Sequence, residues 1–188
     1  CYVWGAGFHF EKGKHLYQKD ISMPEKFARK IIVKAVRGKL SLERVKEITG
    51  NDKKIAMGDP ALLASKLFNI SPPKKKAYSV GIVSHFLEKN SKIFKDLNNN
   101  LKNSVIIDVE QEPLAFIKKI LDCETIISTA LHPIIIADSY GIPNQWINFS
   151  ENNVSKYKFS DYYSVFDERA FYLDLNKIKV TDQTIEKI

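Results

Sequence analysis

The chain has 188 residues, of which 44% are hydrophobic and 27% are charged. This composition is typical of a globular protein and excludes a largely disordered chain. The longest apolar run, residues 133–137, is far shorter than the roughly 18 residues that a membrane span needs. The net charge of +7 favours an anionic partner: a phosphorylated small molecule, an acidic lipid surface or nucleic acid. No RNP-like aromatic motif or zinc-finger spacing supports nucleic acid, so we expect no nucleic-acid partner.

The N-terminal part predicts short strands joined to helices. Strands are expected at residues 2–4 and 31–36, and the second of them ends at Arg37-Gly38. Ser41 is expected to cap a helix over residues 42–48 that Gly50 closes. The turn at Gly58-Asp59-Pro60 leads into another helix, and Asp59 is expected to cap that helix or to serve as a base.

A proline-lysine segment, residues 71–76, is the clearest boundary, because proline ends the preceding element and the lysines stay in water. We therefore expect a domain over residues 1–73 and another over residues 74–188. Since a domain rarely opens on a buried strand, the strand at residues 2–4 indicates an unusually short protein or missing upstream sequence. The chain shows no basic leader segment, and its two cysteines have no disulfide or metal spacing, so a reducing cytoplasm fits.

The C-terminal part alternates apolar strands with helices. Strands are predicted at 78–83, 104–109, 125–128 and 145–149, and helices at 92–97, 112–121 and 131–140. Such alternation is typical of an α/β fold in which parallel sheets carry helices on both faces. The sequence thus predicts two Rossmann-like sheets, one on each side of the proline-lysine segment.

Ligands of open α/β sheets bind outside the carboxyl ends of the strands, so the residues that follow each strand are the candidates. The turn at residues 128–132 is the first of these. Ser128 and Thr129 are placed to cap the next helix, and His132 lies in its first turn, where free N–H groups and the helix dipole favour an anion. The structural alternative is that His132 packs in the core.

Other cationic or titratable residues follow other strands. Arg37 is suited to a two-pronged contact with carboxylate or phosphate, and His85 can donate to a phosphate or titrate near neutrality. Lys158, Asp161 and Tyr162 are expected together in a loop after the last strong strand. Each of these has a structural alternative. Arg37 would be an ordinary surface arginine, His85 a packed histidine, and the segment with Lys158 a helix N-terminus.

Together these residues predict an anion-binding cleft. The chain contains no GxGxxG, Walker or GxSxG motif and no cluster of metal ligands, so we expect no metal and no bound cofactor.

Six segments in order resemble the polysaccharide pyruvyl transferase family. They are WGAGF at 4–8, AVRG at 35–38, GDPALL at 58–63, VGIVSHF at 80–86, STALHPIIIADSYGIP at 128–143 and KFSDYY at 158–163. The resemblance implies a GT-B-like fold with two Rossmann-like domains facing a cleft. The family usually has a strand and a Gly-Asp turn before the WGAGF-like segment, so we expect the N-terminal domain to be incomplete. It also implies transfer of the pyruvyl group of phosphoenolpyruvate onto a pair of sugar hydroxyls, as a ketal, in the biosynthesis of exopolysaccharide or capsule. The acceptor would be a glycan or a lipid-linked sugar, with possible proximity to the membrane.

The resemblance assigns roles to the candidate residues. His132 is the candidate for the acid or the phosphate contact. Arg37, His85 and Lys158, with Ser128 and Thr129 in the turn, would bind the donor. The residues left for the acceptor or for a structural role are Asp59, Asp161 and Tyr162.

The chain departs from the family at one position of this motif. Many members carry an arginine two residues before the motif histidine, where this chain has Ala130. Either Arg37 or Lys158 supplies the missing charge, or phosphoenolpyruvate binds more weakly. Two other functions stay open: a GT-B sugar-nucleotide glycosyltransferase, and a non-catalytic relative that binds glycans or anions.

Overall fold

The computed structural model describes residues 1–11, 31–50, 54–149 and 156–188. The chain forms two compact units. Unit 1 joins Cys1–Pro60 to Ser155–Ala170, and unit 2 joins Ala61–Val154 to Phe171–Ile188. The domain division at residues 73–74 stays a prediction.

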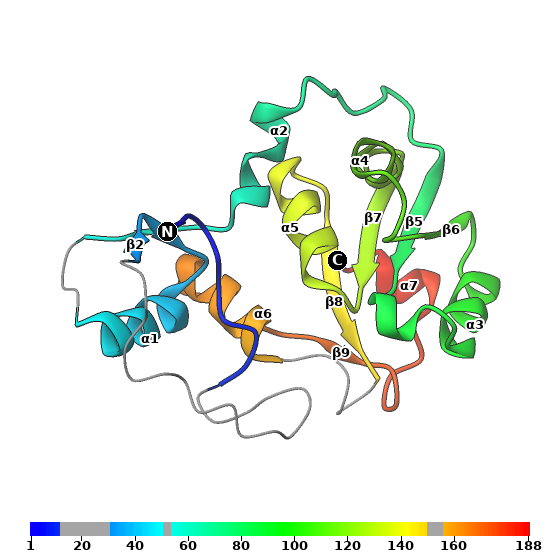
Figure 1. Cartoon of the computed structure of the whole chain (residues 1–188). Helices are drawn as coiled ribbons and strands as arrows, with labels where there is room; N and C mark the ends of the chain where they lie inside the picture. Colours follow the sequence, from blue (N-terminus) through cyan, green and yellow to red (C-terminus); the bar gives the residue numbers. More distant parts are fainter. Residues whose placement is uncertain (12–30, 51–53, 150–155) are drawn as a thin grey trace. The chain divides into compact units, whose positions relative to one another are not determined.

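Unit 2 is built on a parallel sheet of five strands (Figure 1), which confirms the predicted α/β class. In sheet order the strands are β6 (Ser104–Ile107), β5 (Tyr78–Val83), β7 (Cys123–Ser128), β8 (Asn144–Asn148) and β9 (Leu173–Asp174). Every pair of neighbours is parallel. The short edge strand β9 has no counterpart among the sequence predictions.

Helices cover both faces of this sheet because the central strands are apolar on both sides. Helices α4 (Pro113–Leu121) and α5 (Leu131–Ser139) pack on one face, where Ile126 of β7 is fully buried. Helix α3 (Lys92–Asn100) and the segment that includes α7 (Asp182–Ile185) pack on the other, against Ile127. Three short elements complete the unit: η1 (Pro60–Leu63), α2 (Ala64–Leu67) and η2 (Phe86–Glu88).

The strand order positions a site. Numbered along the chain, the five strands lie in the order 2-1-3-4-5, so the connections leave the first strand in opposite directions. This reversal falls between β5 and β7, and in doubly wound sheets a ligand binds at the carboxyl ends of the strands at that point. The residues that follow Val83 and Ser128 therefore flank the expected binding crevice.

Unit 1 contains two pairs of short parallel strands among its described residues. Strand β1 (Tyr2–Val3) pairs with β2 (Ile32–Val33), and β3 (Ala35–Val36) pairs with β4 (Ala56–Met57). A single parallel bridge joins Ala6 to Val36. The helices of this unit are α1 (Lys39–Thr49), α6 (Lys156–Tyr163) and η3 (Ser164–Phe166).

Two local predictions for unit 1 are wrong, and one is confirmed. Helix α1 begins at Lys39 after the N-cap Gly38, so Ser41 lies inside its first turn and is not the cap. Residues 156–163, expected as a loop, form the helix α6. Gly50 does end α1, in the left-handed conformation with a φ of 60° that glycine adopts without strain.

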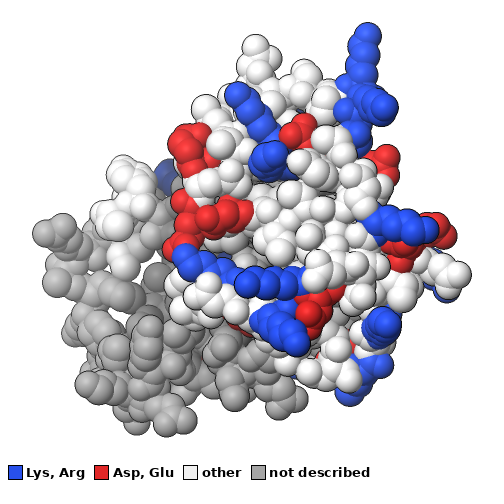
Figure 2. Space-filling model, turned by 90° about the vertical axis from the view of Figure 1, so that its right-hand side faces the viewer, with Lys and Arg blue, Asp and Glu red and all other residues white. Residues whose placement is uncertain are grey.

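No helix in the described part of the chain is both long enough and apolar enough to cross a membrane. On the face drawn in Figure 2, acidic and basic side chains lie interspersed.

The two cysteines differ in their surroundings, which gives a testable contrast. Cys1 is exposed, whereas Cys123 is fully buried in the core of unit 2. Burial, with the nearby Asp122 carboxylate, raises the pKa of Cys123 to about 12. At pH 8 we expect a thiol reagent to label Cys1 within minutes and to label Cys123 only when the protein unfolds, as mass spectrometry of the labelled peptides would show.

The same pKa shift predicts a loss of stability in alkali. Above pH 9 the Cys123 thiol ionises in the unfolded chain but stays protonated in the folded one, so its contribution to stability falls as the pH rises toward about 12. A Cys123→Ala variant should lack this part of the alkaline loss. Rapid labelling of Cys123 in the native protein would contradict its burial.

Candidate functional site

Two loops meet at the carboxyl ends of β5 and β7 in unit 2, and hydrogen bonds hold them together. The Thr129 hydroxyl accepts the backbone N–H of His85 at 2.8 Å. The Thr129 N–H donates to the carbonyl of Val83, the last residue of β5, at 3.1 Å. His85 and Thr129 are 9% and 0% exposed, so these bonds are formed away from water and fix the two loops at the reversal of the sheet.

The Ser128 hydroxyl shapes the second loop from inside. It accepts the N–H of Ala130 at 2.9 Å and lies 2.9 Å and 3.0 Å from the carbonyl oxygens of Val83 and Ala130. Ser128 is fully buried. Its hydroxyl is therefore engaged by the protein backbone, and the same is true of Thr129. A direct donor contact from either hydroxyl stays a prediction.

Helix α5 begins directly after this loop, with Ala130 as its N-cap. The N-cap makes no side-chain hydrogen bond, so the expected capping by Ser128 and Thr129 is not what the structure shows. The backbone N–H groups at the start of a helix and the helix dipole favour an anion at this end. His132 is the second residue of the helix and is exposed, which rules out a histidine packed in the core.

His85 holds its imidazole in a defined orientation. Its Nδ1 accepts the N–H of Leu87 at 3.4 Å and so caps the short helix η2. In the neutral ring this places the proton on Nε2, which makes Nε2 a donor. The Phe86 ring lies against the imidazole, with ring centroids 4.6 Å apart. The structure thus brings His85, Ser128, Thr129 and His132 together at one edge of one sheet.

The bond between Thr129 and His85 predicts a specific loss. In a Thr129→Val variant the buried N–H of His85 keeps its place but loses its acceptor, which costs about 1–3 kcal/mol. Urea unfolding should show this loss. Thr125→Val is the matched control, because Thr125 lies on β7, the strand that Thr129 directly follows, and is also buried at 8% exposure. Equal losses in the two variants would contradict the positioning role of Thr129.

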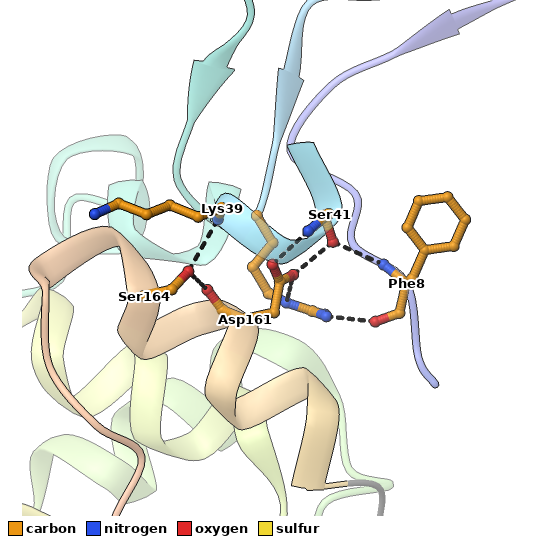
Figure 3. Close-up of polar contacts among 6 residues, drawn as sticks. Phe8, Lys39, Ser41, Asp161 and Ser164 are labelled. Atoms are coloured by element: carbon orange, nitrogen blue, oxygen red, sulfur yellow. Dashed lines mark hydrogen bonds and ion pairs between the residues drawn. The ribbon is translucent and has the colours of Figure 1, made fainter. Parts of the chain in front are cut away.

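In unit 1 the carboxylate of Asp161 binds Arg37 and Ser41 (Figure 3). Asp161 is fully buried and accepts from the Arg37 Nε at 3.0 Å. The same carboxylate accepts the backbone N–H of Ser41 at 2.8 Å and the Ser41 hydroxyl at 2.6 Å. The Arg37 guanidinium also donates to the Phe8 carbonyl at 2.6 Å. Asp161 is therefore bonded to the protein on both oxygens.

These bonds explain why α1 needs no cap of its own. The backbone N–H of Ser41 donates to the Asp161 carboxylate of helix α6. The backbone N–H of Lys39 donates to the hydroxyl of Ser164, the residue after α6, at 2.9 Å (Figure 3). A carboxylate at a helix N-terminus also interacts favourably with the dipole. Gly38 is required at the N-cap because a Cβ there would lie 1.7 Å from the Asp161 carbonyl oxygen.

Three further predicted residues lie in unit 1. Lys158 is 6% exposed and stands one helical turn before Asp161, on the same face of α6. Tyr162 is fully buried and packs edge-on against Tyr163 and Phe166, with ring centroids 5.2 and 5.4 Å away. Asp59 is 8% exposed and precedes η1. Tyr162 thus has a core position, as its apolar surroundings require.

A residue that the sequence analysis does not single out stands beside these cations. His9 is exposed and directly follows the WGAGF segment. Burial, and then the charges of Lys158 and Arg37, lower the pKa of its imidazole below the usual 6.5. Its position next to that segment was the one available indication in the sequence. Among the described residues, no group of three or more His, Cys, Asp or Glu side chains is placed to hold a metal ion.

One comparison with known proteins identifies a family. The family model described as polysaccharide pyruvyl transferase matches residues 1–151. The uncharacterized protein L143 of Acanthamoeba polyphaga mimivirus is 31% identical over 135 residues, which cover 70% of this chain and 47% of that protein. The chain thus spans about half the length of the curated relative it matches. Because the family model covers most of the chain, the protein belongs to the polysaccharide pyruvyl transferase family.

Proposed function

We propose that the protein transfers the pyruvyl group of phosphoenolpyruvate to a sugar of a polysaccharide or its precursor, forming a ketal with two hydroxyls. Family membership supports pyruvyl transfer onto polysaccharide. The observation that carries the donor assignment is the edge of unit 2 where the N-terminus of α5 and the exposed His132 lie at the reversal of the sheet. A donor with a phosphate and a carboxylate suits such an edge.

The chemistry requires an acid, a base and groups that hold phosphate. Protonation of the methylene carbon gives cationic character to the central carbon, which one sugar hydroxyl then attacks. Phosphate leaves, and the second hydroxyl closes the ketal. The two sugar hydroxyls lose two protons in all. One of these protons is accounted for by the methylene carbon, which becomes a methyl group, and the other leaves with the phosphate. Groups aimed at the developing charges lower the barrier.

Within unit 2, His132 is proposed as the acid or the phosphate contact, and the Nε2 of His85 as a donor to the phosphate. Ser128 and Thr129 are proposed to fix the loop from which the anion is bound, since their hydroxyls bond to the backbone. In unit 1 we propose that Arg37 and Lys158 contribute to donor binding. Their positive charges would stand in for the arginine that Ala130 replaces.

The acceptor is proposed to be a glycan or a lipid-linked sugar met in the cytoplasm near the membrane, and Asp59 and Tyr162 are the residues kept for acceptor or structural roles. The family match does not favour the alternative of a sugar-nucleotide glycosyltransferase. The other alternative, a non-catalytic relative, is decided by turnover.

An assay of the purified chain tests the proposal. Incubation with phosphoenolpyruvate and a panel of lipid-linked or nucleotide-linked sugars should release inorganic phosphate only when an acceptor is present. The product should gain the mass of pyruvate less one water. Binding of phosphoenolpyruvate without turnover would favour the anion-binding relative. Thermal stabilisation by a uridine diphosphate sugar, and not by phosphoenolpyruvate, would favour the glycosyltransferase.

A further inference from the structure

The backbone on both sides of His9 in unit 1 is held by side chains of α1 and of Arg37, two residues before that helix. Arg37 donates to the Phe8 carbonyl at 2.6 Å, and Arg44 donates to the Phe10 carbonyl at 2.6 Å. The Phe8 N–H donates to the Ser41 hydroxyl at 3.0 Å. The Arg44 guanidinium also lies over the Phe8 ring, 4.1 Å from its centroid. Three hydrogen bonds and one ring contact therefore fix a short loop.

His9 stands at the tip of this fixed loop with its imidazole exposed. The Phe10 ring packs edge-on against it, with centroids 4.5 Å apart, which restricts the orientation of the imidazole. A histidine that is both accessible and held on rigid backbone has the properties that proton transfer to a substrate requires.

Partial burial and the charges around His9 both favour its neutral form. The positive charges of Lys158 on α6 and Arg37 after β3 disfavour a proton on the imidazole. Arg44 on α1 bonds to the carbonyl of the next residue, Phe10. The Asp161 carboxylate is bonded to Arg37 and Ser41. The cations outnumber the carboxylate. Partial burial of the imidazole, and then the charges of Lys158 and Arg37, lower the pKa of His9 below its usual 6.5, which favours the neutral ring that can accept a proton at pH 7.

We propose that His9 is the general base of the reaction, the group that takes the proton from the attacking sugar hydroxyl. This inference rests on the proposed function. It follows from the exposed, clamped position of His9 beside Arg37 and Lys158, the two residues of unit 1 proposed to bind the donor.

The proton that His9 accepts has a defined destination. As the hydroxyl oxygen bonds to the central carbon, its O–H bond breaks and the proton passes to the imidazole. The bond from that carbon to the phosphate oxygen breaks, and the proton leaves with the phosphate. His9 is thereby neutral again, and no oxidant, reductant or further reactant is needed.

Steady-state kinetics of a His9→Gln variant test the assignment. We expect kcat to fall by about 10²- to 10⁴-fold, with little change in the KM for phosphoenolpyruvate, because glutamine keeps size and polarity but cannot accept the proton. In the wild type, kcat/KM should rise with pH through a pKa below 6.5, and the variant should lack that rise. Added imidazole should partly restore a His9→Ala variant.

Tyr2→Ala is the control, since Tyr2 is an exposed aromatic residue of the same unit, 72% exposed. Turnover by the wild type and by this control tests the proposed function, and the His9 variants test only the base. The assignment is overturned if His9→Gln keeps wild-type kcat. It is also overturned if the low-pH limb persists in the variant, or if kcat falls only together with thermal stability.

Discussion

Replacing His132 with alanine is expected to lower kcat for pyruvyl transfer by about 10²- to 10⁴-fold while leaving the melting temperature unchanged. The kinetic loss follows if the imidazole supplies a proton or a phosphate contact in the transition state. Stability should hold because His132 is exposed and the buried residues around it, among them Leu131 and Ile134, supply the packing of α5. Phosphate release and differential scanning fluorimetry measure the two effects.

His132→Gln separates the two roles, since glutamine can donate a hydrogen bond but cannot transfer a proton at neutral pH. If this variant recovers kcat, His132 binds phosphate; if it recovers only the KM for phosphoenolpyruvate, His132 is the acid. Asp138→Ala is the control, because Asp138 is an exposed residue near the other end of the same helix. Full activity in His132→Ala would remove this residue from the site.

Asp161→Ala is expected to destabilise unit 1 by about 3–5 kcal/mol, the usual cost of removing one partner from a buried ion pair. The Arg37 side chain, 8% exposed, would keep its charge without its partner. The Ser41 N–H and hydroxyl would lose their acceptor as well. Native-state hydrogen exchange of the amides of α1 measures the loss within this unit.

Asp167→Ala provides the matched comparison for Asp161. Asp167 also pairs with a cation of the α1 region, Lys39, but their side chains are 83% and 42% exposed. Exposed pairs contribute about 0–1 kcal/mol, so exchange in α1 should hardly change. Similar exchange rates for the two variants would contradict the account of Asp161 as the carboxylate that organises unit 1.

Much of unit 2 could be predicted from the sequence because its strands are long and apolar. Strand β5 lies at the predicted residues 78–83, and α5 ends within one residue of its prediction, before the left-handed Gly141. Buried parallel strands read as continuous apolar runs, and glycine marks the helix end. His85 lies beside Thr129 because β5 and β7 are neighbours in the sheet. The alternation of strands and helices in the sequence does not specify which strands are neighbours.

The two errors in the predicted elements of unit 1 share one cause. Ser41 fits a local capping pattern, yet the N-terminus of α1 is accepted by Asp161, 120 positions along the chain. The segment 156–163 is rich in aromatic residues, which have a lower helix propensity. It is helical because several of its side chains are buried in tertiary contacts. Contacts between residues so far apart leave no periodic pattern. His9 was missed for the same reason, since its neighbours Arg37 and Lys158 come from distant segments.

A crystal structure of the chain soaked with phosphoenolpyruvate tests the donor site most directly. We expect the phosphate or carboxylate of the ligand at the N-terminus of α5, within hydrogen-bond distance of the His132 side chain and of backbone N–H groups of the first turn. Phosphoenolpyruvate bound only at a place remote from α5, or no binding at concentrations that support turnover, would contradict the proposed donor site.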